Sequence, residues 1–177
     1  MKMLSVLMLC GAMAISACVP GGTVGTGSGG RLNSQDPGEI QFRTLDSVNA
    51  LRGARGLQPM QLNAELNAAA ATHSRDMSVQ NRPWHFGSDG SSPLDRVQRV
   101  GYRGLLVGEL ISETYQTEIE TLSDWMEAPD TRAIIMDPRA NQMGFSWYQE
   151  PNGKIWWTMI TGSSGGAAPL LAAAPLQ

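Results

Sequence analysis

The hydrophobic pattern of this chain changes its period once, and this change restricts the folds that the chain can adopt. Residues 143–148 alternate between two faces, and residues 155–160 alternate in the same way after the turn sequence Pro151-Asn152-Gly153. A period of two on each side of a tight turn predicts a β-hairpin. A shorter apolar run at 105–111 predicts a third strand of the same antiparallel sheet.

Four segments ahead of the hairpin carry apolar residues three or four positions apart, which predicts helices. Helices that cover both faces of a small antiparallel sheet give an α+β fold, an α-β-α sandwich. The stripes are Leu45, Val48 and Leu51, ending at Gly56; Leu62, Leu66, Ala69, His73 and Met77, with Asn63 as N-cap; Leu94, Val97 and Val100, between Ser92-Pro93 and Gly101; and Ile119, Leu122 and Trp125, from the capping box Thr117 to Glu120 up to Pro129.

The N-terminal segment is typical of an export signal. Lys2 precedes an apolar run, Met3 to Ala17, which is too short for a membrane-spanning helix and has the length of a secretory signal. The run ends in Ile15-Ser16-Ala17-Cys18, which resembles the lipobox of bacterial lipoproteins. We therefore expect residues 1–17 to be a lipoprotein signal peptide and Cys18 to be lipidated. The alternative is an ordinary cleaved signal with an incidental Cys18.

The chain then divides into a tether, one domain and a tail. Residues 18–38 contain the lipidated cysteine and a Gly-rich tether, 39–162 form the domain, and 163–177 are a low-complexity tail. Cys10 is lost with the signal, so the mature protein has no disulfide. Val19 follows the cysteine, which favours the outer membrane over the inner one. We expect an exported protein anchored to the outer membrane and facing the periplasm, and we expect it to be a monomer.

The charge balance argues against nucleic acid as a partner. The chain has 13 Lys and Arg against 16 Asp and Glu, a net charge of −3, and no basic run interrupts it. Eleven of the 13 cations are arginines spread singly along the chain, a pattern typical of a solvated surface.

Any imidazole chemistry must use one of two histidines. His73 lies on an apolar helical stripe, where a structural role is the commoner one. His85 instead lies in a Gly- and Pro-rich loop beside Trp84, and loops carry many functional sites. Asp89 either orients the imidazole or forms an Asx-turn. Glu109 is a lone carboxylate between apolar neighbours, which predicts burial with a partner.

Five segments stand in order: Asn49 to Arg52 with Gly56-Leu57, Ala70 to Met77, His85 to Pro93, Arg96 to Tyr102 followed by Gly108-Glu109, and Trp125 to Arg132. Together they resemble the CAP superfamily, or SCP domain, of cysteine-rich secretory proteins, insect-venom antigen 5 and plant pathogenesis-related proteins, in its bacterial disulfide-free branch. The resemblance implies an α-β-α sandwich with a shallow cleft of two histidines and two acids, sometimes holding a divalent ion such as zinc. By position His85 matches the first histidine, Asp89 lies near the first acid, and Glu109 matches the glutamate.

The chain departs from the family pattern at two positions. Thr131 stands where the second histidine belongs, and Leu110 replaces the family's Asn after the glutamate. Because zinc takes three or four ligands, we expect no cofactor, with His85 and Glu109 only weak candidates for binding a divalent cation. Ser88, Ser91 and Ser92 fit ordinary turn chemistry.

These residues favour a non-catalytic binding module with a cleft of His85, Asp89, Glu109, Thr131 and Trp84. Its expected partners are the membrane, through the lipid anchor, and a cell-wall, lipid or envelope-protein ligand. The alternative is an envelope peptide or glycan hydrolase that uses His85 with Asp89 and Glu109. A purely structural role in the envelope also fits the tether.

Overall fold

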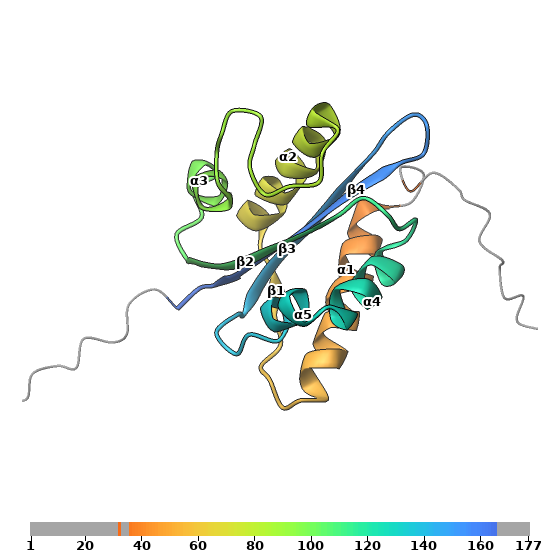
Figure 1. Cartoon of the computed structure of the whole chain (residues 1–177). Coiled ribbons are helices and arrows are strands. Elements are labelled where there is room, and N and C mark those ends of the chain that lie inside the picture. Colours follow the sequence, from red (N-terminus) through yellow and green to blue (C-terminus); the bar gives the residue numbers. More distant parts are fainter. Residues whose placement is uncertain (1–31, 33–35, 166–177) are drawn as a thin grey trace, which may run out of the picture.

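The computed structural model describes residues 32 and 36–165 and shows an α+β fold (Figure 1). The expected signal peptide, Cys18, and most of the tether and tail lie outside the described residues. The elements in chain order are α1 (Pro37–Gly53), β1 (Gln61–Leu62), α2 (Ala64–Gln80), α3 (Pro93–Arg99), β2 (Leu105–Ser112), α4 (Glu118–Glu127), α5 (Pro129–Ile135), β3 (Gln142–Gln149) and β4 (Ile155–Ser163).

The sheet has four strands in the order β1-β3-β4-β2. The expected hairpin is β3 and β4, with Trp147 opposite Trp157, and β2 pairs antiparallel to β4 as predicted. The purely antiparallel sheet is a wrong prediction in one respect, since β1 pairs parallel to β3 and makes the sheet mixed. Two residues are too short to show a period, so β1 could not be recognised from the hydrophobic pattern.

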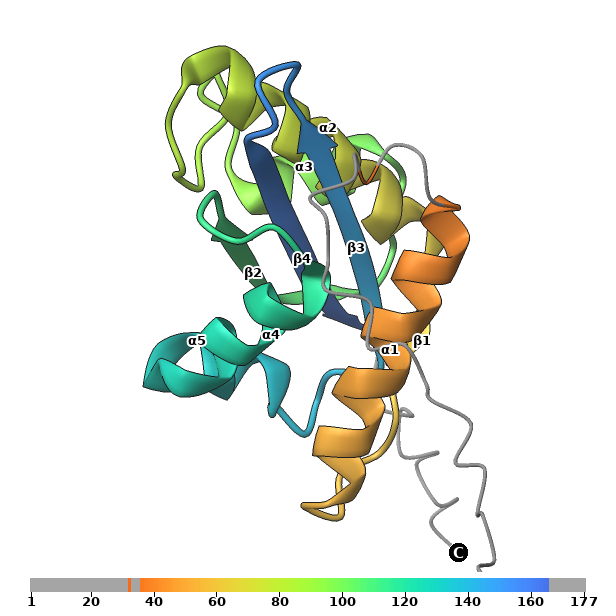
Figure 2. The same ribbon diagram turned by 90° about the vertical axis from the view of Figure 1, so that its right-hand side faces the viewer.

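Helices cover both faces of the sheet, which confirms the α-β-α sandwich (Figure 2). One face packs against α1, α4 and α5 through a core that includes Ile40, Trp125 and Trp157. The other face packs against α2 and α3 through a smaller core that includes Leu66 and Val97. At Gly144 the backbone of α2 lies so close to β3 that a Cβ atom would overlap Leu66 and Asn67. This close approach sets the position of α2 over the sheet.

The helix starts follow the expected capping chemistry. Asn63 caps α2 through a bond from Leu66 N, and both Ser92 and Thr117 form full capping boxes at α3 and α4. The α4 helix ends at Glu127, just before Pro129 as expected, and Pro129 then occupies the first turn of an additional helix, α5, which was not predicted. Proline is well tolerated at that position, since a backbone N–H in the first turn of a helix has no hydrogen-bond partner within the helix.

The domain begins earlier than the expected boundary at residue 39. The α1 helix starts at Pro37, and the side chain of Asp36 caps it by accepting a bond from Gly38 N at 2.8 Å. Leu32, within the expected tether, is only 3% exposed and belongs to the larger core. Leu32 and residues 36–38 of the expected tether therefore belong to the folded domain.

Candidate functional site

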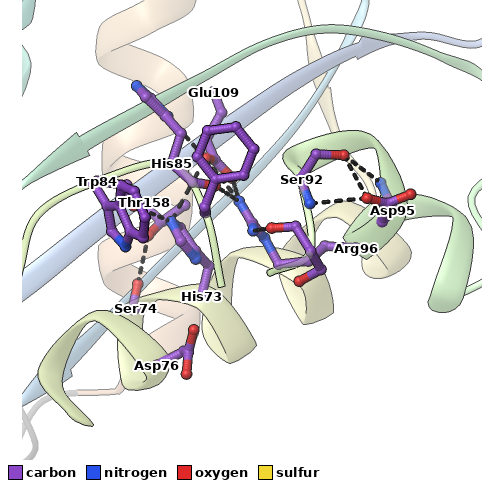
Figure 3. Close-up of polar contacts among 12 residues, drawn as sticks. His73, Ser74, Asp76, Trp84, His85, Ser92, Asp95, Arg96, Glu109 and Thr158 are labelled. Atoms are coloured by element: carbon purple, nitrogen blue, oxygen red, sulfur yellow. Dashed lines mark hydrogen bonds and ion pairs between the residues drawn. The ribbon is translucent and has the colours of Figure 1, made fainter. Parts of the chain in front are cut away.

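Glu109 is the centre of a buried polar cluster between β2 and the α2–α3 layer (Figure 3). It is 6% exposed, and Nη2 of Arg96 donates to its two carboxylate oxygens at 2.7 and 2.9 Å. Arg96, on α3, is itself buried, and its guanidinium also donates to the carbonyls of Ser91 and His85. One cation therefore neutralises the carboxylate and fixes the loop that carries His85.

His85 contacts the same carboxylate from the surface. Its Nδ1 lies 2.9 Å from Oε1 of Glu109, while half of its side chain is exposed. Because a carboxylate accepts, Nδ1 carries the proton and Nε2 of the neutral ring keeps the lone pair. The structure thus confirms that Glu109 is buried with a partner, and it brings Glu109 and His85 together.

His73 lies behind this pair and is fully buried on α2. Its Nε2 donates to the carbonyl of Trp84 at 3.0 Å and lies 3.6 Å from Oε1 of Glu109. Burial lowers the pKa of His73, and the nearby Arg96 charge lowers it further, against an opposing effect of Glu109. Its Nδ1 is buried with no hydrogen-bond partner in the described part of the protein. The core position with one bonded nitrogen agrees with the structural interpretation of His73, but its contact with the site was not foreseen.

The lowered pKa of His73 predicts a loss of stability in acid. A group whose pKa is lower in the folded than in the unfolded state contributes stability above the unfolded value, and this contribution is lost as the pH falls. We expect the unfolding free energy of the wild type to fall more steeply from about pH 7 to about pH 5 than that of His73→Gln. Denaturant unfolding across this range measures the difference, and parallel curves for the two proteins would contradict the assignment.

Asp89 does not orient His85, so that prediction is wrong. Its carboxylate accepts from Ser91 N at 3.0 Å and pairs with Arg99 at 2.9 Å on the surface. The bonds from Ser91, followed by that from Arg99, hold the pKa of Asp89 well below its ordinary value. The alternative interpretation as a turn residue is the correct one. Asp89 and Arg96 both line a hollow of about 170 Å³.

Thr131 does not share a cleft with His85 and Glu109, so that prediction is also wrong. It lies on α5, which packs on the opposite face of the sheet from α2 and α3. Its hydroxyl donates to the carbonyl of Trp125 at 2.6 Å, which joins the end of α4 to α5. Thr131 therefore has a structural role at the junction of α4 and α5.

Trp84 lies beside the site, half-buried, with one ring face covered. The guanidinium of Arg82 stacks 3.9 Å from the ring centroid, and the indole N–H donates to Gln80 at 2.8 Å. Phe86 contacts the ring at a centroid distance of 5.5 Å and is itself exposed. The covered face weakens the case for Trp84 as a sugar-stacking platform, whereas Phe86 and Arg82 lie at the surface.

The described residues do not fit a zinc ion at Glu109. Zinc needs unprotonated lone pairs, but both imidazole nitrogens that face this carboxylate are donors, His85 Nδ1 to Glu109 and His73 Nε2 to Trp84. The cation that the carboxylate already meets is the guanidinium of Arg96. Within residues 36–165 no three His, Cys, Asp or Glu side chains are grouped to hold a metal.

Arg96 does most to organise the site, and this role was not predicted from the sequence. Scattered single arginines were interpreted as a solvated surface, and Arg96 lies beside the predicted apolar stripe. The signal that the sequence offered was its place next to Val97 of that stripe. In the structure these two residues of α3 are buried, whereas Leu94 is exposed. Asp76 was also missed; it accepts from Ser88 N and Oγ at 2.7 and 2.6 Å and fixes the loop to α2.

The fold and the histidine–glutamate pair define a domain of the CAP class. The family model for cysteine-rich secretory proteins, CAP, matches residues 45–161, and the chain belongs to this family. The protein YkwD of Bacillus subtilis is 28% identical over 120 residues, which cover 68% of this chain and 46% of YkwD, so the match spans about half of that relative.

Solved structures show the same fold at low identity. An outer surface protein of Borrelia burgdorferi matches with a TM-score of 0.66 at 13% identity, over 73% of this chain and 96% of that one. An extracellular SCP-domain protein of Bacillus anthracis matches with a TM-score of 0.61 at 19% identity, over 71% of this chain and 44% of that one. No helix in the described part of the chain combines the length and apolar character that crossing a bilayer requires.

Proposed function

We propose that this protein is a lipid-anchored lipoprotein of the bacterial cell envelope whose CAP domain binds an envelope ligand beside His85 without converting it. The lipobox-like Ile15 to Cys18 supports the anchor, and Val19 supports an outer-membrane position facing the periplasm. The names of two similar proteins, an outer surface protein and an extracellular protein, agree with an exported domain.

The ion pair of Glu109 with Arg96 is the observation that carries the binding role. Both carboxylate oxygens accept from Arg96, and one of them also accepts from His85. A carboxylate in these bonds is a poor metal ligand, because its charge and lone pairs are already engaged. Glu109 therefore holds the half-exposed ring of His85 in place, and Nε2 is left to bond a ligand.

The hydrolase alternative is favoured by one feature, the bond of His85 Nδ1 to Glu109. A carboxylate that holds one ring nitrogen leaves the other as a general base, as in many hydrolases. The hydroxyl side chains of the loop do not supply a nucleophile, since Ser88 donates to Asp76, the buried Ser91 bonds Asp89, and Ser92 caps α3. Asp89 is paired with Arg99, so an activated water is the remaining nucleophile.

Binding and turnover can be separated with residues 19–177 and isolated peptidoglycan. We expect the protein to co-sediment with it, no soluble product to form, and His85→Ala to weaken binding about tenfold, a loss of about 1.4 kcal/mol. The matched control is Asp89→Asn, which removes a carboxylate of the same loop that does not bond His85 and should leave binding unchanged.

Products that appear with the wild type and disappear with His85→Ala would establish the hydrolase instead. Equal co-sedimentation of wild type and His85→Ala would show that the site around His85 does not bind the ligand. The anchor is tested separately by the intact mass of the mature N-terminus, and an unmodified Cys18 would refute the lipoprotein.

A further inference from the structure

One end of the domain gathers the start of α1, the end of α2 and the β3–β4 turn (Figures 1 and 2). Pro37 and Gln41 line a hollow together with Ser146 and Trp147, which places the start of α1 beside the second half of β3. Ser78, in the last turn of α2, donates to Glu150 next to the turn at 2.8 Å. The loop that carries His85 leaves α2 at this same end.

This end exposes several large apolar side chains. Phe42, near the start of α1, is 60% exposed; Val79, at the end of α2, is 75% exposed; and Phe86, in the following loop, is 47% exposed. Phe42 belongs to α1, on the opposite face of the sheet from α2, so Val79 and Phe86, on α2 and the loop that follows it, are the exposed apolar residues of one side. Single exposed apolar residues are common, whereas two large ones on one short segment favour contact with another surface. Arg82 lies among them with its guanidinium on Trp84, so a fixed cation accompanies the apolar groups.

The chain enters the domain at this end as well. Leu32, the first residue that the structure describes, is packed in the core, and 13 residues, 19–31, separate it from Cys18 in the sequence. A Gly-rich segment of this length has a root-mean-square span of about 20 Å. A bilayer attached to Cys18 is therefore present at an effective concentration in the range of about millimolar for this end of the domain.

We propose that this docking end, formed by Val79, Arg82, Trp84 and Phe86, rests on the surface of the bilayer that anchors the chain. Phe86 and Val79 enter the boundary between headgroups and acyl chains, and Arg82 pairs with a lipid phosphate. An indole with a stacked guanidinium has the amphipathic character that suits this boundary. His85, adjacent to Phe86, then faces ligands at headgroup level. The inference rests on the proposed function for the lipid anchor.

The chain itself supplies the means of testing this contact. Cys18 is the only thiol of residues 18–177, and every described contact lies within residues 32–165, so this chain retains the whole fold. We couple it through Cys18 to a maleimide lipid in vesicles of phosphatidylcholine and phosphatidylglycerol and measure amide hydrogen exchange. We expect exchange in residues 79–88 to slow about tenfold on coupling, and exchange in residues 94–105 to stay unchanged.

Matched variants locate the contact. Phe86→Ser and Val79→Ser should each remove most of the protection, about tenfold, whereas Leu94→Ser and Leu105→Ser should not change it. Both control leucines are similarly exposed, 49% and 62%, but belong to α3 and β2 away from this end. Arg82→Gln should reduce protection about fivefold on vesicles with phosphatidylglycerol and leave it unchanged on pure phosphatidylcholine.

Unchanged exchange at 79–88 on coupling, or protection that the leucine controls reduce as much as Phe86→Ser does, overturns the proposal. Protection that Phe86→Ser and Val79→Ser leave intact also overturns it. The chemical coupling does not depend on lipidation in the cell, so an unmodified Cys18 in the mature protein refutes the lipoprotein without altering the vesicle result.

Discussion

Replacing Arg96 with methionine is expected to lower the free energy of unfolding by about 3–5 kcal/mol. The change leaves the Glu109 carboxylate, whose side chain is 2% exposed, without the guanidinium that pairs with it. An uncompensated buried charge costs far more than the net value of the ion pair itself. The variant also loses the bonds from the guanidinium to the carbonyls of Ser91 and His85. Denaturant unfolding of the purified variant measures the loss.

Two further variants establish the cause of this loss. Arg99→Met removes an exposed arginine of the same helix, whose pair with Asp89 is at the surface, and should leave stability unchanged. The double variant Arg96→Met with Glu109→Leu removes both charges and should recover a large part of the stability. A double variant as unstable as Arg96→Met would show that the buried charge is not the cause.

The second large effect is expected for Arg52→Met, at the end of α1. Arg52 is fully buried and donates to the carbonyls of Gln58, Ile135, Asp137 and Ala140 at 2.6 to 3.1 Å. Methionine matches the stem but satisfies none of these acceptors, and each unsatisfied buried group costs roughly 1–3 kcal/mol. We expect a loss of at least about 3 kcal/mol in unfolding free energy. Thermal and denaturant unfolding measure it.

Arg55→Met provides the comparison for Arg52, because it removes an exposed arginine just after the same helix. It should leave the unfolding midpoint where it is in the wild type. Burial lowers the pKa of Arg52, against the opposing charge of Asp137, which marks it as a cation held by backbone carbonyls in the core. Equal stability of the two variants would mean that these four bonds contribute little.

The helices and the hairpin could be predicted because their signals are local. Asn63, Ser92 and Thr117 act as N-caps as expected, and the alternation at 143–148 and 155–160 gives β3 and β4. A period in the sequence fixes which side chains share a face before any distant contact forms. Arg52 even had such a signal, since it follows Val48 at helical spacing and is buried on the same face of α1.

The site could be predicted only in part. His85 stood out as a loop histidine and Glu109 as a carboxylate among apolar residues, and the structure joins them. Asp89 and Thr131 were placed wrongly. Asp89 bonds its near neighbours Ser91 and Arg99, and Thr131 bonds a carbonyl at the end of α4. Neither the spacing to His85 nor the family position shows which of several competing partners a polar side chain will bond.

The sequence by itself determined α1 to α4, the hairpin of β3 and β4 with β2 beside it, and the two residues of the histidine–glutamate pair. Only the tertiary structure decided that Arg96 neutralises Glu109, that His73 lies behind it, and that Leu32 fastens the chain to the core. The physical reason is that hydrophobic periodicity and helix capping depend on residues close to one another in the sequence. The partner of a buried charge is chosen by desolvation among groups brought together by folding, such as α3 and β2 here.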